Sequence, residues 1–217
     1  MSKLTLVIGN KNYSSWSLRA WFLLRQAGID FDEVKVLLHQ NNSAIEQHSP
    51  SGRVPVLIDG DLKIWESLAI CEYVAERYPA ARLWPEDVKA RAFARSISSE
   101  MHAGFTGVRK HMPMNCHARF PERQMPPGVA EDIRRITSIW NECRKNYAGA
   151  GEFLFGHFTA ADAMFAPVVI RFLIYGIQLD PVSSDYRDMI LSLPAMQEWL
   201  QAACDETETI PELEALK

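Results

Sequence analysis

Apolar positions in the first part of the chain follow strand spacing and helix spacing in turn. Leu4 to Gly9 is a short apolar run and predicts a buried strand. From Ser14 the apolar residues recur at helical intervals, and Gly28 is typical of a residue just past a helix end. Residues 31–37 alternate and are rich in valine, which predicts a second strand. The short connections of this β-α-β unit favour parallel strands.

A hairpin and a helix follow a polar stretch. Residues 41–51 are polar and predict an irregular loop. Two apolar runs, residues 54–58 and 62–65, flank an Asp-Gly pair, which is a strong hairpin signal. The apolar stripe of residues 67–78 predicts a helix that Pro79 ends. The order β-α-β, loop, β-β-α is that of a thioredoxin-like domain.

The rest of the chain has helical spacing without a convincing strand. We therefore predict an α/β thioredoxin-like N-terminal domain at residues 1–80, a linker at 81–86 and an all-α C-terminal helical bundle at 87–217. A proline-rich piece, residues 112–128, separates the first two long helices of the bundle. The helices expected in this half span residues 86–112, 129–147, 159–176, 186–192 and 194–204.

Composition and charge exclude several classes of partner. Of 217 residues, 47% are hydrophobic and 23% charged, and the net charge of -4 leaves no basic footprint for nucleic acid. The most apolar stretch, residues 163–177, is interrupted by Pro167 and Arg171 and is shorter than the roughly 18 apolar residues of a membrane span. It therefore predicts a buried helix. Because the first residues lack a secretory signal, we expect a cytoplasmic protein.

The cysteines and histidines do not form a metal-site pattern. Cys116 and His117 are adjacent and His111 is nearby, but the second pair of ligands that zinc sites need is missing. We therefore expect no metal. Cys71 lies on the apolar stripe of a predicted helix and is expected in the core. The four cysteines, which we expect to be reduced because no CxxC pair is present, are Cys71, Cys116, Cys143 and Cys204.

Two serines stand where the first strand leads into the first helix. Hydroxyl residues at such a position are ordinary helix caps, which is one interpretation of Ser14 and Ser15. The other interpretation is that they serve an anion, because the positive end of a helix at the carboxyl end of a strand is a ligand site. A thiolate is such an anion. Lowering a thiol pKa of about 8.5 by one unit takes about 1.4 kcal/mol, which one or two charge-assisted hydrogen bonds supply.

Two further pairs of residues have a structural and a functional interpretation. Pro55 stands at the start of a predicted strand, where a trans proline is ordinary. If the Val54-Pro55 bond is cis, the Val54 backbone is exposed for pairing with an extended peptide-like ligand. Glu66 and Ser67 open the next helix. Ser67 either caps this helix or binds the α-carboxylate of a ligand whose α-ammonium faces Glu66.

These motifs resemble the glutathione S-transferase family, above all its serine-type zeta and theta classes and their bacterial relatives. Residues 14–19 (SSWSLR), 53–57 (RVPVL) and 66–70 (ESLAI) match the N-terminal domain of that family in order and spacing. Residues 159–162 (TAAD) resemble the capping box of its C-terminal core helix. The match covers essentially the whole chain. It implies a homodimer that uses glutathione as co-substrate.

The resemblance assigns roles position by position. Ser14 or Ser15 donates a hydrogen bond to the glutathione sulfur, and by analogy with zeta-type enzymes we take Ser14, the first of the pair. Val54 pairs with the cysteinyl backbone, and Glu66 and Ser67 hold the γ-glutamyl group. Contacts at the glycyl end are implied for Gln40 and Arg53.

The sequence departs from the zeta pattern at one position. Trp16 stands where zeta-type enzymes usually have a cysteine. The resemblance therefore does not by itself imply their isomerase chemistry on maleylacetoacetate, which stays an alternative, whereas the glutathione contacts that it implies remain in place. The cysteine-type classes are disfavoured because no cysteine lies at this helix start. The electrophile site is expected on the helical half, where methionines at helical spacing either adapt to apolar ligands or fill the core. The positions assigned to it are Met101, Met112 and Met114, with His102, Phe105, Arg109 and Asn115 nearby.

The function that the resemblance implies is that of a glutathione transferase, which activates the thiol for attack on a small, apolar electrophile. Two alternatives remain open from the sequence. One is a module that binds glutathione or apolar ligands without turnover. The other is a glutathione-dependent isomerase, dehalogenase or peroxidase, because all of these use the same thiolate.

Overall fold

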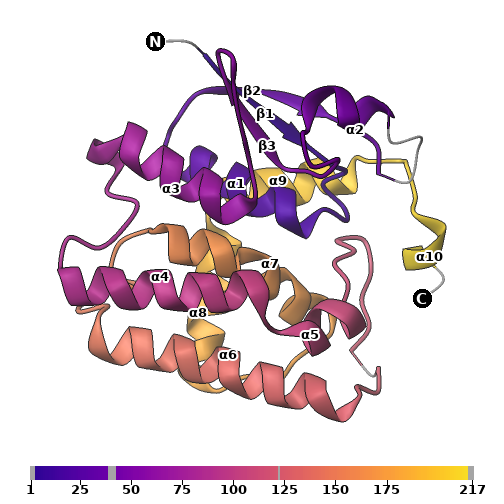
Figure 1. The fold of residues 1–217 in the computed structure, drawn as a ribbon. Coiled ribbons are helices and arrows are strands. Elements are labelled where there is room, and N and C mark those ends of the chain that lie inside the picture. Colours follow the sequence, from indigo (N-terminus) through magenta and orange to yellow (C-terminus); the bar gives the residue numbers. More distant parts are fainter. Residues whose placement is uncertain (1–2, 39–42, 122, 215–217) are drawn as a thin grey trace.

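The computed structural model describes residues 3–38, 43–121 and 123–214. Figure 1 shows a small sheet at one end of the molecule, a layer of helices that covers one of its faces, and further helices below them. The last described residues return to the sheet side, so the C-terminal segment lies beside the N-terminal half. The two halves of the chain therefore meet along a broad helical layer.

The four-stranded sheet has the order β2-β1-β3-β4. Strands β1 (Leu4–Ile8) and β2 (Phe31–Lys35) pair in parallel, as the short β-α-β connection predicted. Strand β3 (Val56–Asp59) is antiparallel to β1 and forms the predicted hairpin with β4 (Leu62–Trp65). The central strands β1 and β3 are the more buried ones, which agrees with their apolar sequences.

Two predicted helices of this half are confirmed and one was missed. Helix α1 (Ser15–Gln26) contacts helix α3 (Ser67–Arg77) on the covered face of the sheet. The stretch expected to be an irregular loop contains a short helix, α2 (Ser43–His48). Ile45 provides the reason, because its side chain is buried against the sheet in a small cluster with Val7 and Val56. A single apolar residue in a polar segment gave too weak a periodic signal to predict this helix.

The second half contains helices only, as predicted, within the part of the chain that the structure describes. Helix α7 (Ala160–Ile174) lies at its centre and contacts α1, α4 (Val88–Ala103) and α8 (Pro181–Ser192), so it joins the two halves of the molecule. No helix of the described residues is long and apolar enough to span a membrane. After the short 3-10 turn at Pro79–Ala81, the helices are α4 (Val88–Ala103), α5 (Thr106–His111), α6 (Pro127–Asn146), α7 (Ala160–Ile174), α8 (Pro181–Ser192), α9 (Pro194–Cys204) and α10 (Pro211–Glu214).

The prediction of one long helix over residues 86–112 was wrong, because the chain breaks between α4 and α5. Phe105 has φ 58°, a left-handed conformation that cannot continue a helix. The Arg109 side chain satisfies carbonyl groups left free by the break: its Nε donates to the Gly104 carbonyl at 2.7 Å, and Nη2 to the His102 carbonyl at 3.1 Å. Nη2 also donates to the carbonyl of Met101.

The capping box at the start of α7 is confirmed. The Asp162 carboxylate accepts from the Thr159 N–H at 2.8 Å and from the Thr159 hydroxyl at 2.9 Å. It also accepts from the Leu154 N–H and the Tyr186 hydroxyl, both at 3.1 Å. Thr159 and Asp162 are fully buried, so this network fixes the start of the helix that joins the two halves.

Candidate functional site

Two adjoining cavities lie beside the start of α1, and the larger of them reaches the helical half at the end of α4. One has a volume of about 450 Å³ and the other about 360 Å³, and both are lined by Trp16, Arg53 and Val54. The smaller cavity adds Ser14 and Ser15, whereas the larger adds the start of α3 and the end of α4. Three segments that the sequence singled out thus border one cleft. The remaining residues that line the larger cavity are Ser51, Pro55, Glu66, Ser67, His102 and Ala103.

Ser14 is the cap of helix α1, and its hydroxyl both accepts and donates a hydrogen bond. Its Oγ accepts from the Ser17 N–H at 3.4 Å and donates to the Ser17 Oγ at 2.7 Å. The Ser17 Oγ also accepts from the Gly9 N–H at 3.0 Å, which ties the helix to the end of β1. The capping interpretation of Ser14 is therefore confirmed as a structural role.

Ser15 is the first residue of α1, and its side chain contacts the helical half. Its Oγ accepts a hydrogen bond of 3.0 Å from Nη2 of Arg171, a residue of helix α7. The backbone N–H of Ser15 donates to the Tyr13 carbonyl at 2.9 Å. Because this amide and that of Ser17 are already engaged, the start of α1 offers an anion fewer free N–H groups than the sequence pattern predicted.

The backbone beside Val54 is placed for a ligand. The Val54-Pro55 bond is cis, which is the conformation that the functional interpretation of this pair required. The β3 ladder begins only at Val56, so Val54 precedes the paired residues and borders both cavities. Arg53 is exposed, and its backbone N–H donates to the Ser49 hydroxyl at 3.1 Å, which fixes the turn before the strand.

The start of helix α3 carries no side-chain cap. Glu66 occupies the cap position with φ 68°, and its carboxylate extends toward His102 of α4 at 3.4 Å. The Ser67 hydroxyl does not cap the helix. It is buried and makes a weak contact of 4.0 Å with the Met164 sulfur. An uncapped helix start beside a cavity is a site for a carboxylate ligand.

His102 lies between the two halves with its ring held as a neutral base. Burial, with the charges of Arg19 and Arg109, lowers the pKa of His102, although Glu66 opposes this. Its Nδ1 is buried without a hydrogen-bond partner among the described residues, while Nε2 faces Glu66. The sequence placed His102 only near the electrophile site, and the structure places it beside the predicted γ-glutamyl contacts.

Trp16 forms the wall between the two cavities, a role that the sequence did not predict. The guanidinium of Arg19 lies 4.4 Å from the centre of its ring and that of Arg109 lies 4.6 Å from it. The His102 ring meets it edge-on at 5.3 Å. The residue that replaces the zeta-type cysteine is therefore a fixed aromatic surface.

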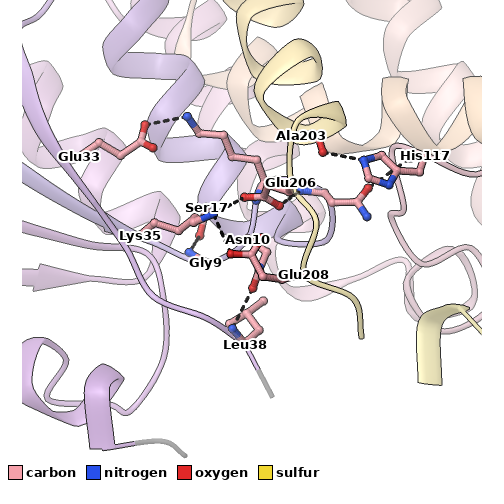
Figure 2. A network of polar contacts seen from close by, with 12 residues as sticks. Gly9, Asn10, Ser17, Glu33, Lys35, Leu38, His117, Ala203, Glu206 and Glu208 are labelled. Atoms are coloured by element: carbon pink, nitrogen blue, oxygen red, sulfur yellow. Dashed lines mark hydrogen bonds and ion pairs between the residues drawn. The ribbon is translucent and has the colours of Figure 1, made fainter. Parts of the chain in front are cut away.

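The C-terminal segment holds the loop between β1 and α1, as Figure 2 shows. The Glu206 carboxylate accepts from the backbone N–H groups of Lys11 and Asn12 at 2.8 and 3.0 Å. Further along, the Tyr13 hydroxyl donates to Glu214 at 2.8 Å. These contacts connect residues nearly 200 positions apart in sequence, for which no local pattern exists. They fix the loop from which Ser14 and Ser15 follow.

The other predicted site residues are placed as follows. Gln40 lies outside the described residues. Met101, Met112 and Met114 are buried in the hydrophobic core, and their assignment to an electrophile pocket stays a prediction. The carbonyls of Met101 and Met112 accept from Arg109 and Arg171, so the backbone of this stretch contributes to the region behind Ser15.

The described residues contain no cluster of metal ligands, and two of the buried cysteines are not activated. No group of three His, Cys, Asp or Glu side chains there could hold a metal ion. Burial raises the pKa of Cys71 and that of Cys116 to about 12, so both thiols are protonated at neutral pH. Cys71 lies in the core, as predicted.

Comparison with protein families identifies both halves of the chain. Residues 13–77 match the N-terminal domain of glutathione S-transferases, and residues 126–202 match the C-terminal domain of the same proteins. The chain is 31% identical over 210 residues to rat maleylacetoacetate isomerase, covering 92% of this chain and 93% of that one. It is 32% identical over 205 residues to glutathione S-transferase Z2 of Arabidopsis thaliana, covering 86% and 88%.

Solved structures share the fold. A Burkholderia glutathione transferase homolog crystallised with bound glutathione matches with a TM-score of 0.72 at 23% identity, over 94% of this chain and 100% of that one. A theta-class glutathione S-transferase from Xanthomonas axonopodis pv. citri, also with glutathione bound, matches with a TM-score of 0.67 at 23% identity, over 92% and 98%.

Proposed function

The chain belongs to the glutathione S-transferase family, and from this premise we propose that its cleft binds glutathione and presents the thiolate to a small electrophile. The observation that supports this most is the convergence on one cleft of the α1 start, Val54 and the α3 start. Each of the three suits a different part of one tripeptide.

Glutathione lies along the two cavities in this proposal. Its γ-glutamyl carboxylate occupies the uncapped start of α3 at Ser67, and its ammonium faces Glu66. The cysteinyl backbone pairs with Val54, which lies outside the sheet ladder. The sulfur then reaches the smaller cavity, where Ser14 and Ser15 lie at the positive end of α1.

The reaction needs only the thiol and the electrophile. The thiol proton leaves to solvent, and the thiolate is stabilised by a serine hydroxyl and the helix end. The sulfur uses an electron pair to form a bond to the electrophilic carbon, and the leaving group departs with its bonding pair. The residues of the cleft therefore act by lowering the thiol pKa and by orienting the sulfur.

The direct test is glutathione binding by calorimetry together with conjugation of chlorodinitrobenzene and a panel of other electrophiles. We expect saturable binding and conjugation that depends on both substrates. Glutathione binding without turnover of any electrophile in the panel would favour the alternative of a binding module. Absence of glutathione binding would overturn the proposal itself.

A second candidate reaction is glutathione-dependent isomerisation, which the similarity to rat maleylacetoacetate isomerase favours. In such a reaction the thiolate adds to a conjugated double bond, the bond rotates, and elimination regenerates glutathione. The two reactions differ in stoichiometry. Conjugation consumes one glutathione for each product molecule, whereas isomerisation leaves the glutathione concentration unchanged while the substrate spectrum changes.

The proposal includes a homodimer and a cytoplasmic location. Leu62 and Trp65 on the edge strand β4 are 50% and 42% exposed, which supports an apolar contact there between two copies. Sedimentation velocity is expected to give the mass of a dimer. Trp65→Glu is expected to shift it toward monomer, and Val182→Glu, at a comparably exposed apolar residue of α8, is the matched control.

A further inference from the structure

We propose that Arg171 is a positioning residue that makes Ser15, rather than Ser14, the hydroxyl that donates to the glutathione sulfur. The inference rests on the proposed function, because it concerns how the same cleft activates the thiol. It follows from the direction of the hydrogen bonds around the two serines and from the charge that lies behind them.

The proton of the Ser14 hydroxyl already takes part in a hydrogen bond within the protein. The hydroxyl donates to the Ser17 Oγ at 2.7 Å, and its oxygen accepts from the Ser17 N–H at 3.4 Å. The Ser17 Oγ accepts from the Gly9 N–H as well, so this chain of bonds continues into the end of β1. Donation from Ser14 to a ligand would require the cap of helix α1 to give up a buried hydrogen bond.

Among the described residues no acceptor takes the Ser15 hydroxyl proton, because the partner of this hydroxyl, Arg171, can only donate. A guanidinium carries no acceptor, so the 3.0 Å contact with Nη2 of Arg171 uses an acceptor lone pair of the Ser15 Oγ. The O–H is left to point into the smaller cavity, which Ser15 lines. Donation from Arg171 also polarises that O–H, which strengthens its hydrogen bond to an anion.

The Arg171 guanidinium is held rigidly in place. Its Nε donates to the Met112 carbonyl at 2.8 Å, and the side chain is 4% exposed. The remaining nitrogen, Nη1, is buried and has no hydrogen-bond partner among the described residues. A buried cation with an unused donor directly behind a cavity-lining hydroxyl creates a site that favours an anion in front of it.

The charged groups around the contact between Arg171 and Ser15 add to the positive charge behind this serine. Burial, with the charge of Arg109, lowers the pKa of Arg171 to about 10, so it remains charged at neutral pH. Arg19 and Arg109 lie close enough for their charges to act on one another, with Asp132 partly offsetting Arg109. In the described segments, the three guanidinium groups donate to backbone carbonyls and to Ser15.

Besides Arg109, the titratable groups whose charges act on Arg171 are Cys116 and Tyr175, and both are neutral near pH 7. Burial raises the pKa of Cys116 to about 12 and also raises that of Tyr175, so neither neutralises Arg171. Burial and Glu214 raise the pKa of Tyr13. The Glu214 carboxylate accepts from the Tyr13 hydroxyl. The other ionisable residues that border the cleft are His102, Glu66 and Arg53.

The test is a double-mutant cycle read from the pKa of the bound thiol. Wild type, S14A, S15A, R171M and S15A/R171M are saturated with glutathione and titrated through the ultraviolet absorbance of the thiolate. We expect S15A and R171M each to raise the bound-thiol pKa by one unit or more, which is a tenfold lower thiolate fraction below that pKa. We expect the double variant to add little, because both substitutions remove the same polarised hydrogen bond.

Controls separate positioning from folding and from the proposed function. R135M removes an exposed arginine paired with Glu100 and is expected to leave the thiol pKa unchanged. R171K keeps the charge and is expected to keep part of the shift. If R171M fails to fold, the comparison of S14A, S15A and R171K still decides.

Three results would overturn the inference: an unchanged thiol pKa in S15A or in folded R171M, a larger rise in S14A than in S15A, or fully additive effects in the double variant. A wild type that binds no glutathione would instead overturn the proposed function.

Discussion

The starts of helices α7 and α1 carry similar polar side chains that serve different purposes. At α7, Thr159 and Asp162 are buried, and the carboxylate accepts four hydrogen bonds from the protein. At α1, Ser14 and Ser15 border a cavity, and one of the two hydroxyls has only a donor as its partner. Polar groups that are all paired internally hold the fold together, whereas polar groups left with an unused donor are available to a ligand.

The charges at the two sites differ in the same way. The positive end of α7 is met by the carboxylate of Asp162 from its own chain. The first turn of α1 contains no acidic residue, and Arg19, Arg109 and Arg171 lie behind it. The start of α1 therefore lacks the anion that α7 has from its own chain, and in the proposed function the glutathione thiolate is that anion.

The largest effect is expected from a substitution at the start of α7, where the polar groups are all paired within the protein, and it is an effect on stability. Asp162→Ala leaves the Thr159 N–H, the Leu154 N–H and the Tyr186 hydroxyl buried without an acceptor. We expect a loss of about 3–5 kcal/mol in the free energy of unfolding, measured by urea denaturation.

Asp180→Ala is the matched control, since this exposed residue caps α8. We expect it to cost only about 1 kcal/mol. Equal losses in the two variants would show that the burial of the α7 site contributes nothing.

The next largest effect is expected at the start of α1, and it changes the rate of catalysis rather than the stability of the fold. Replacing Ser14 and Ser15 together by Ala is expected to reduce the conjugation rate about 10²- to 10³-fold, the usual result of removing a donor to a developing anion. Glutathione affinity is expected to change far less, because the hydroxyls act on the sulfur. Steady-state kinetics and calorimetry separate the two quantities. Wild-type rates in this variant would leave the activation account without support.

A smaller effect is expected at the start of α3, where the Glu66 side chain faces the ammonium group of glutathione in the proposed function. Glu66→Ala is expected to weaken glutathione binding about tenfold through the lost contact with its ammonium group. Calorimetry measures this change, and Glu198→Ala, an exposed glutamate paired with Arg25, is the control. Unchanged affinity in Glu66→Ala would remove this residue from the site.

The smallest effect concerns pH. Because burial lowers the pKa of His102 in the folded protein, the unfolded chain binds a proton at higher pH than the folded chain does. The wild type is therefore expected to lose stability relative to His102→Gln as the pH falls below about 6.5, the ordinary histidine value. Thermal unfolding of both proteins between neutral and acidic pH measures this. If the melting temperatures of the two proteins changed with pH in the same way, the pKa of His102 would not be lowered in the folded state.

Local features of the sequence predicted most of the fold, and they singled out the residues at the α1 start, at Val54 and at the α3 start that border one cleft in the structure. The hairpin at Asp59-Gly60 and the capping box at Thr159 are encoded within a few residues, and both are confirmed. The break at Phe105 was not predictable, because a left-handed residue held by the Arg109 side chain leaves the helical spacing intact. A single apolar residue, Ile45, anchors the helix that was missed.

Contacts between the two halves were beyond local patterns. Arg171 meets Ser15 across 156 residues, and Glu206 meets Lys11 across 195. Arg171 did leave one signal, since it is the only charged residue of α7 after Asp162 in the first turn, in the most apolar of the described helices. A charge in that position needs a reason, and its hydrogen bond to Ser15 provides one.

The most direct measurement is the ionisation of glutathione on the wild-type protein, followed through the thiolate absorbance as the pH is raised. The account predicts a bound-thiol pKa at least one unit below the free value of about 8.5, so that the thiolate fraction of bound glutathione at neutral pH is several times that of free glutathione. Bound glutathione whose thiol ionises at the free value would contradict it.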